Sequence, residues 1–272
     1  MKNITLNRLQ RRGKYMKNIT LILFCLTLTL MISVENTISK IDPDSIVGIW
    51  LLDEGQGNTV KDESDNKNDG TITGAEWTEG KIGRGLEFDG TSRVEIPASE
   101  SIDDFLDGFT YLLWVKPTGP PPNANTRLIE RDWHNPTIQI GNNNDFYGSI
   151  AVNADQGSSN VRGGEWKMDE WSFVAITYNG TDLKLFVNDE FVGENEVGKP
   201  DEKLKTEIRF GAWRNSGWDF IGILDEVGVF NVPLSESDLN NVMKNGLEGA
   251  ADVSPVRKLA TTWGDVKSIK IR

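Results

Sequence analysis

The segment FIGILDEVGVF, from Phe220 to Phe230, constrains the fold of this chain more than any other feature. Apolar residues alternate in it with small or polar residues, which is the pattern of a β-strand. Pro233 ends the strand, because proline cannot donate a hydrogen bond to a sheet. Ser235 then provides a helix N-cap with an acidic residue three positions later, and Gly246 provides a stop signal. The sequence therefore predicts a long strand followed by a short helix at residues 235–245.

Short strand patterns separated by turn residues fill most of the remaining chain. Their ends are rich in Gly, Asn, Asp and Pro, and three consecutive prolines near residue 121 exclude that segment from a sheet. Trp50, Trp114 and Trp171 lie in apolar strand segments, so we expect them in the core. This spacing predicts an all-β fold, a two-sheet antiparallel jelly-roll sandwich with one short C-terminal helix. The further strands are expected at residues 47–52, 74–77, 80–90, 93–97, 109–115, 127–130, 137–140, 146–152, 170–178, 182–187, 191–192 and 208–211.

The first 36 residues have the pattern of an export signal. Lys17 precedes an apolar run from Ile19 to Val34, as in a secretory signal. A membrane span needs about 20 apolar residues, so a cleaved signal is favoured over an uncleaved anchor. Such an anchor is the only way in which we expect this chain to contact a membrane. MKNIT occurs at both Met1 and Met16, which makes Met16 a second candidate start. We expect a secreted, periplasmic or cell-surface protein.

The predicted organisation is a signal segment at residues 1–36, a folded domain at 37–249 and a basic tail at 250–272. Six of the 29 basic and one of the 41 acidic residues lie in the first 36, which leaves 23 and 40, a net charge of −17. Binding of nucleic acid needs a basic face, so nucleic acid is not an expected partner. The single cysteine, Cys25, lies in the signal segment, so the exported domain would depend on its core rather than on disulfides.

Short motifs occur in a fixed order between residues 47 and 245. The motif residues are Trp50, Glu54-Gly55, Gly57, Asp62, Asn68-Asp69-Gly70, Trp77, Gly80 to Gly83, Phe88-Asp89-Gly90, Trp114, Trp171, Val174 to Tyr178, Leu185 to Asn188, Gly222 and Asp225-Glu226. In these motifs the chain resembles the LamG-like jelly roll of the concanavalin A-like lectin and glucanase superfamily. The resemblance implies a fold that mostly binds ligands outside cells, as in laminin G domains, pentraxins and bacterial sugar-binding modules.

In pentraxin-like and laminin G-like relatives, calcium and ligand lie on loops at one rim of the sandwich. The resemblance implies that residues 131–135 and 213–219 form the corresponding rim in this chain. Tryptophan faces can stack on sugar rings, and the alternative is that the loop tryptophans pack on one another. The expected ligand-binding residues are Arg131, Trp133, His134, Asn135, Trp213, Arg214 and Trp218.

The same rim is the expected place for a calcium ion. Asp132, Asn215 and Asp219 carry the hard oxygen ligands that calcium prefers. The alternative is that these are turn residues whose side chains bond their own backbone. For Asp89 and Asp225 we expect hydrogen bonding at turns and strand ends.

No catalytic residues are expected. Glucanases of this sandwich use the pattern Glu-x-Asp-x-x-Glu, and retaining chemistry needs two carboxyl groups about 5–5.5 Å apart. The nearest segment here runs from Glu130 through Asp132 to Asn135, with asparagine in place of the second glutamate. Asp225 and Glu226 are adjacent on a strand and should face opposite sides. One histidine and one cysteine exclude a His/Cys zinc site.

The sequence therefore predicts an exported, non-catalytic module that binds a carbohydrate or glycoconjugate through rim loops, with calcium as a candidate cofactor. Its partner would be a glycan, a glycoprotein or another surface molecule. The alternatives are a protein-binding adhesion or structural module and a degenerate glycoside hydrolase.

Overall fold

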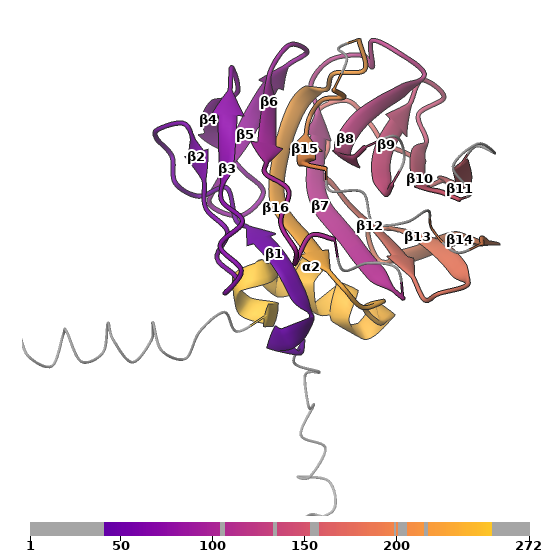
Figure 1. Ribbon diagram of the computed structural model, residues 1–272. Coiled ribbons are helices and arrows are strands. Elements are labelled where there is room, and N and C mark those ends of the chain that lie inside the picture. Colours follow the sequence, from indigo (N-terminus) through magenta and orange to yellow (C-terminus); the bar gives the residue numbers. More distant parts are fainter. Residues whose placement is uncertain are drawn as a thin grey trace, which may run out of the picture. The chain divides into compact units, whose positions relative to one another are not determined.

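Two antiparallel sheets packed face to face make up the described part of the chain (Figure 1). The computed structural model describes residues 41–103, 107–132, 135–152, 158–198, 200, 206–214 and 217–251. This is the jelly-roll sandwich that the alternating strand segments predict, because each sheet buries one face against the other.

The first sheet is built around the long strand β16. One side of β16 pairs with β7, and its other side pairs with β5 and β1 at different points along its length. The strand order is β14-β13-β12-β7-β16-β5-β4, with β1 beside β16. The predicted strand at 220–230 is thus confirmed as the centre of this sheet. Its strands are β1 (Ile46–Trp50), β4 (Glu76–Glu79), β5 (Arg84–Asp89), β7 (Phe109–Pro117), β12 (Ser172–Tyr178), β13 (Asp182–Val187), β14 (Glu190–Glu196) and β16 (Ile221–Phe230).

The second sheet has the order β11-β10-β9-β8-β15-β6-β3-β2. The strands expected from the sequence did not include β2, β3 and β11 and covered only part of β14. Of these, β2, β11 and β14 lie at sheet edges, where polar residues replace the apolar alternation. The strands are β2 (Thr59–Val60), β3 (Gly70–Thr73), β6 (Arg93–Ile96), β8 (Asn125–Arg131), β9 (Thr137–Gly141), β10 (Phe146–Ala151), β11 (Ser158–Gly163) and β15 (Ile208–Phe210).

A large apolar cluster fills the space between the two sheets. Trp50 is fully buried in it and meets the ring of Phe210 edge to face at a centroid distance of 5.3 Å. A second cluster lies on the outer face of the first sheet, where α2 (Glu236–Ala251) covers Trp114 and its neighbours. Trp171 is only half-buried and packs at the margin of this second cluster. The predicted core position is therefore confirmed for Trp50 and Trp114, whereas Trp171 lies at the margin of the core.

The helix begins as predicted and ends later than predicted. The Ser235 hydroxyl donates to Asp238 Oδ2 at 2.6 Å, and the Asp238 N–H donates to Ser235 Oγ at 3.2 Å. Gly246 interrupts the helix with a φ of 73°, but helical structure resumes as far as Ala251. The Glu226 carboxylate accepts a hydrogen bond from the Leu247 N–H and holds this last turn against β16. Within the described ranges, no helix has the length and apolar character needed to cross a membrane.

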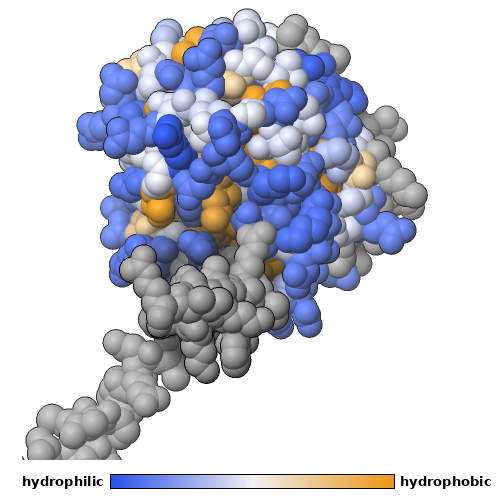
Figure 2. Space-filling model, turned by 90° about the vertical axis from the view of Figure 1, so that its left-hand side faces the viewer, coloured by the Kyte–Doolittle hydropathy of each residue, from blue (hydrophilic) through white to orange (hydrophobic). Residues whose placement is uncertain are grey.

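The exposed face beside β2–β4 is largely hydrophilic, with small separate hydrophobic areas (Figure 2). Residues 41–251 contain 38 acidic and 17 basic side chains. The folded body is therefore more acidic than the whole chain, whose net charge is −12.

Candidate functional site

The two loops predicted to form a rim meet in the structure. The segment after β15 turns back along β8, where the Arg127 N–H donates to the Trp218 carbonyl at 2.9 Å. Gly211 starts this turn with a φ of 76°, and a Cβ there would lie 2.2 Å from the Phe88 ring, so glycine is needed. Arg214 then reaches across to the end of β8, with its Nη1 atom 2.9 Å from Asp132 Oδ1.

Two tryptophans of the second loop form an edge-to-face pair. The rings of Trp213 and Trp218 are 4.8 Å apart at an angle of 82°. Both side chains are partly exposed, so each ring packs on the other and also presents surface to solvent. The Trp213 Nε1 atom is buried and has no hydrogen-bond partner. A sugar ring could lie on the exposed part of the indole surface, whereas a ligand hydroxyl could reach the Nε1–H only if the side chain shifted.

The two described carboxylates proposed as calcium ligands are both engaged with the protein. Asp219 accepts a hydrogen bond from the Gly217 N–H at 3.1 Å, which is the turn interaction considered as its alternative role. Asp132 has a φ of 45° and pairs with Arg214. Its Oδ1 atom has no hydrogen-bond partner, so this contact is an ion pair without hydrogen-bond alignment. Calcium binding at Asp132 would require the Arg214 guanidinium to move away.

No group of three or more His, Cys, Asp or Glu side chains among the described residues is arranged to hold a metal ion. Trp133, His134 and Asn215, which complete the predicted sets, lie outside the described residues.

Arg131 does not lie on the rim. Its side chain is fully buried and forms an ion pair with Asp103 inside the sandwich. Tyr111 lies near this pair, and burial raises the pKa of its hydroxyl to about 12. The assignment of Arg131 as a ligand-binding residue is therefore corrected: strand alternation turns its side chain toward the interior.

Asn135 is nearly fully buried, with 1% of its surface exposed. Its backbone N–H donates to the Arg131 carbonyl at 3.0 Å and closes the turn after β8. Both polar atoms of its side-chain amide lack hydrogen-bond partners. Buried polar groups are normally bonded, so this amide is an exception, and a ligand could reach it only if the turn after β8 opened.

A polar row crosses the outer face of the second sheet beside the rim. Arg127 donates to Glu130 and to Gln139, which stands opposite Arg127 on β9. Residues three apart on a regular strand face opposite sides. A bulge in β8 between Arg127 and Ile129 brings Arg127 and Glu130 onto one face. The adjacent apolar residues Leu128 and Ile129 are a sequence signal for this bulge, and the strand expected at 127–130 did not include it.

Burial raises the pKa of the Glu130 carboxyl to about 7, although Arg127 acts in the opposite direction. Its Oε2 atom accepts from Arg127, whereas Oε1 is buried without a partner. Arg209, opposite Glu130 on β15, is bound to Glu95 and Glu207. The row thus combines satisfied ion pairs with one spare acceptor.

Two further buried carboxyls have a structural role. Asp225 accepts the N–H groups of Lys81 and Ile82 at 2.8 and 2.9 Å and fixes the turn between β4 and β5. Burial raises the pKa of Asp225 and that of Glu226 to about 7. Asp89 bonds Thr91 within its own turn. The expectation of turn and strand-end hydrogen bonding for Asp89 and Asp225 is confirmed.

These pKa values predict that the fold loses stability as the pH rises. Unfolded carboxyls titrate near pH 4, so Glu130, Asp225 and Glu226 bind more protons in the folded state between about pH 4 and pH 7. Each group should remove roughly 3 kcal/mol of stability across that window. The lowered pKa values of Asp69 and Asp89 act in the opposite sense, but both carboxyls lie near the surface and contribute less.

Urea unfolding followed by tryptophan fluorescence should give a higher midpoint at pH 5 than at pH 8. Asp225→Asn should reduce this difference, because the amide imitates the protonated acid and its oxygen can still accept the two N–H groups. A midpoint that is equal at both pH values, or higher at pH 8, would contradict the assignment.

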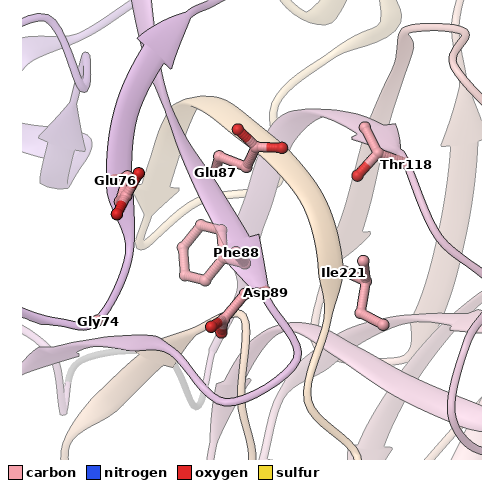
Figure 3. A pocket seen from close by; sticks show the side chains of 7 residues that line it. All are labelled: Gly74, Glu76, Glu87, Phe88, Asp89, Thr118 and Ile221. Atoms are coloured by element: carbon pink, nitrogen blue, oxygen red, sulfur yellow. The ribbon is translucent and has the colours of Figure 1, made fainter.

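A concave feature that does not involve the rim residues lies at the end of the first sheet. A pocket of about 430 Å³ is lined by Gly74, Glu76, Glu87, Phe88, Asp89, Thr118 and Ile221. Figure 3 shows Glu76 and Glu87 on the neighbouring strands β4 and β5, with Thr118 and Ile221 across the pocket. Glu76 and Glu87 stand directly opposite each other in the pairing register, an unfavourable arrangement for like charges. The sequence did not predict this pocket, because its residues come from four separate segments.

Comparisons with known proteins agree with the fold. A family model described as the concanavalin A-like lectin/glucanases superfamily matches residues 88–240. No curated protein matches the chain at a significant level.

Several similar solved structures are binding domains. The binding domain of Paraclostridial Mosquitocidal Protein 1 is 17% identical, with a TM-score of 0.60, over 74% of this chain and 52% of that one. The binding domain of botulinum neurotoxin DC in complex with rat synaptotagmin II is 15% identical, with a TM-score of 0.57 and the same coverage. Domain 4 of an extracellular arabinanase from Geobacillus stearothermophilus, in complex with arabinotriose, is 18% identical, with a TM-score of 0.53, over 73% and 98%. The chain spans about half the length of the toxin binding domains.

Proposed function

This chain belongs to the concanavalin A-like lectin/glucanases superfamily, and on that premise we propose that it is a non-catalytic module that binds a carbohydrate at the rim. The site is formed by Trp213, Trp218 and Arg214 of one loop with Asp132 and Asn135 of the other. The proposed place of action is outside the cytoplasm, because residues 1–36, which lie outside the described residues, have the pattern of an export signal.

The observation that carries this proposal is the tryptophan pair beside unsatisfied polar groups. Trp213 and Trp218 keep part of their ring surface exposed. Trp213 Nε1 and the Asn135 amide are buried without hydrogen-bond partners. Apolar ring faces next to free donors and acceptors match a sugar, whose C–H faces are apolar and whose edges carry hydroxyls. The arabinotriose complex of the similar arabinanase domain supports this choice.

A protein partner is the second candidate. One of the similar toxin domains is in complex with rat synaptotagmin II, so this sandwich can present a surface to a protein. In that case the same tryptophans would serve as anchors, since tryptophan is enriched among the residues that dominate protein interfaces.

The test is a glycan-array screen of the purified protein, carried out in parallel with calcium and with EDTA. We expect binding to at least one oligosaccharide class. If binding is lost in EDTA, calcium assists at the rim; if it is equal in both buffers, the tryptophan surface acts without calcium. A folded protein that binds no glycan in either buffer would refute the carbohydrate proposal and favour the protein partner.

A further inference from the structure

We infer that the glycan bound at this rim is uncharged, and that sugars carrying carboxylate or sulfate groups are excluded. The inference rests on the proposed function and adds the chemical class of the ligand.

The described cations at and beside the rim are already bound to carboxylates. Arg127 donates to Glu130, Arg209 is bound to Glu95 and Glu207, and Arg214 pairs with Asp132. An acidic sugar is usually held by a charge-assisted bond to a free guanidinium or ammonium group. An anion at Arg214, whose side chain is 48% exposed, would have to share the guanidinium with the Asp132 carboxylate or displace it. Each described cation at or beside the rim therefore already faces a carboxylate, and an anion would have to compete with it.

The polar groups without partners at and beside the rim are buried atoms, and their chemistry suits hydroxyls. The acceptors without hydrogen-bond partners are Glu130 Oε1, Asn125 Oδ1, Asn135 Oδ1 and Asp132 Oδ1, and the corresponding donors are Trp213 Nε1 and Asn135 Nδ2. A hydroxyl both donates and accepts, so it can satisfy either kind of group. A carboxylate or sulfate oxygen only accepts, so it cannot satisfy the unpartnered acceptors, and it would lie near the Asp132 carboxylate.

Long-range electrostatics act in the same direction. Residues 41–251 carry 38 acidic and 17 basic side chains, a net charge of −21 that repels anions at low salt. Salt screens this repulsion, since the Debye length falls from about 10 Å at 0.1 M to about 3 Å at 1 M. The competition between an anionic sugar and the carboxylates at the rim does not depend on salt in this way. Measurements at several salt concentrations therefore separate the long-range repulsion from this local effect.

The experiment screens the wild-type protein against neutral, uronic and sulfated oligosaccharides at about 0.1 M and about 1 M salt. It is repeated with Asp132→Asn, which removes the partner of Arg214. Asn tolerates a positive φ, so this variant suits the backbone at 132, where φ is 45°. The matched control is Glu194→Gln, which removes one negative charge from the Lys184–Glu194 pair between β13 and β14.

We expect the wild-type protein to bind neutral glycans alone at both salt concentrations. Asp132→Asn should raise the affinity for the uronic counterpart of the best neutral ligand about tenfold, because the freed Arg214 can pair with its carboxylate. Glu194→Gln should not change it. Wild-type binding of acidic glycans as tight as that of neutral ones, or no gain for Asp132→Asn over the control, would overturn this inference and leave the proposed function standing. Binding of no glycan at all would refute both.

Discussion

Replacing Trp213 or Trp218 with alanine should weaken glycan binding at least tenfold and leave the fold intact. The two rings hold each other in place at a centroid distance of 4.8 Å, so removing either one also releases the other. Loss of a buried aromatic contact at the centre of a binding site costs about 2 kcal/mol or more, and each 1.4 kcal/mol is about tenfold in affinity. Isothermal titration with the best ligand from the array measures the change.

Two further variants make this test specific. Trp171→Ala removes the same side chain from another half-exposed position, beside Lys116 at the margin of the second apolar cluster, and should leave affinity unchanged. Trp213→Phe keeps an aromatic ring but removes the unpartnered Nε1–H, so its affinity should fall between those of wild type and Trp213→Ala. If Trp213→Ala binds as tightly as Trp171→Ala, the rim is not the glycan site.

The strands that form the centres of the sheets could be predicted from the sequence because burial on one or both faces leaves a clear apolar pattern. The segment 220–230 is such a case, and it became β16. Edge strands lack this pattern: Ser158–Gly163 has a single large apolar residue, Val161, yet its backbone pairs with β10 throughout. Pairing of this kind depends on a partner strand that local sequence does not reveal.

The candidate site could be located from the sequence only to the level of loops. The loops around Asp132 and Trp213 do meet, as the family resemblance implied. The direction of individual side chains was not accessible, because it depends on strand register and on the bulge in β8. Arg131 therefore turned out to be an interior residue, while Glu130, considered only as part of an incomplete glucanase motif, supplies a free acceptor beside the rim.

The interior position of Arg131 leads to the second large prediction. Arg131→Ala should destabilise the fold by about 3–5 kcal/mol, because it leaves the Asp103 carboxylate buried without its partner. Urea unfolding followed by tryptophan fluorescence measures the loss. The paired variant Arg131→Met with Asp103→Leu should recover most of it, since apolar residues of similar size can replace a buried ion pair at little cost.

An exposed ion pair provides the control for this experiment. Lys184 Nζ and Glu194 Oε2 lie 3.3 Å apart, with 37% and 53% of the two side chains exposed, so Lys184→Ala should cost less than about 1 kcal/mol. The same measurement decides between the two roles considered for Arg131. A residue on a ligand-binding rim would lose affinity on substitution and keep its stability, whereas an interior residue loses stability first. If Arg131→Ala is as stable as Lys184→Ala, the ion pair with Asp103 does not support the sandwich as the structure indicates.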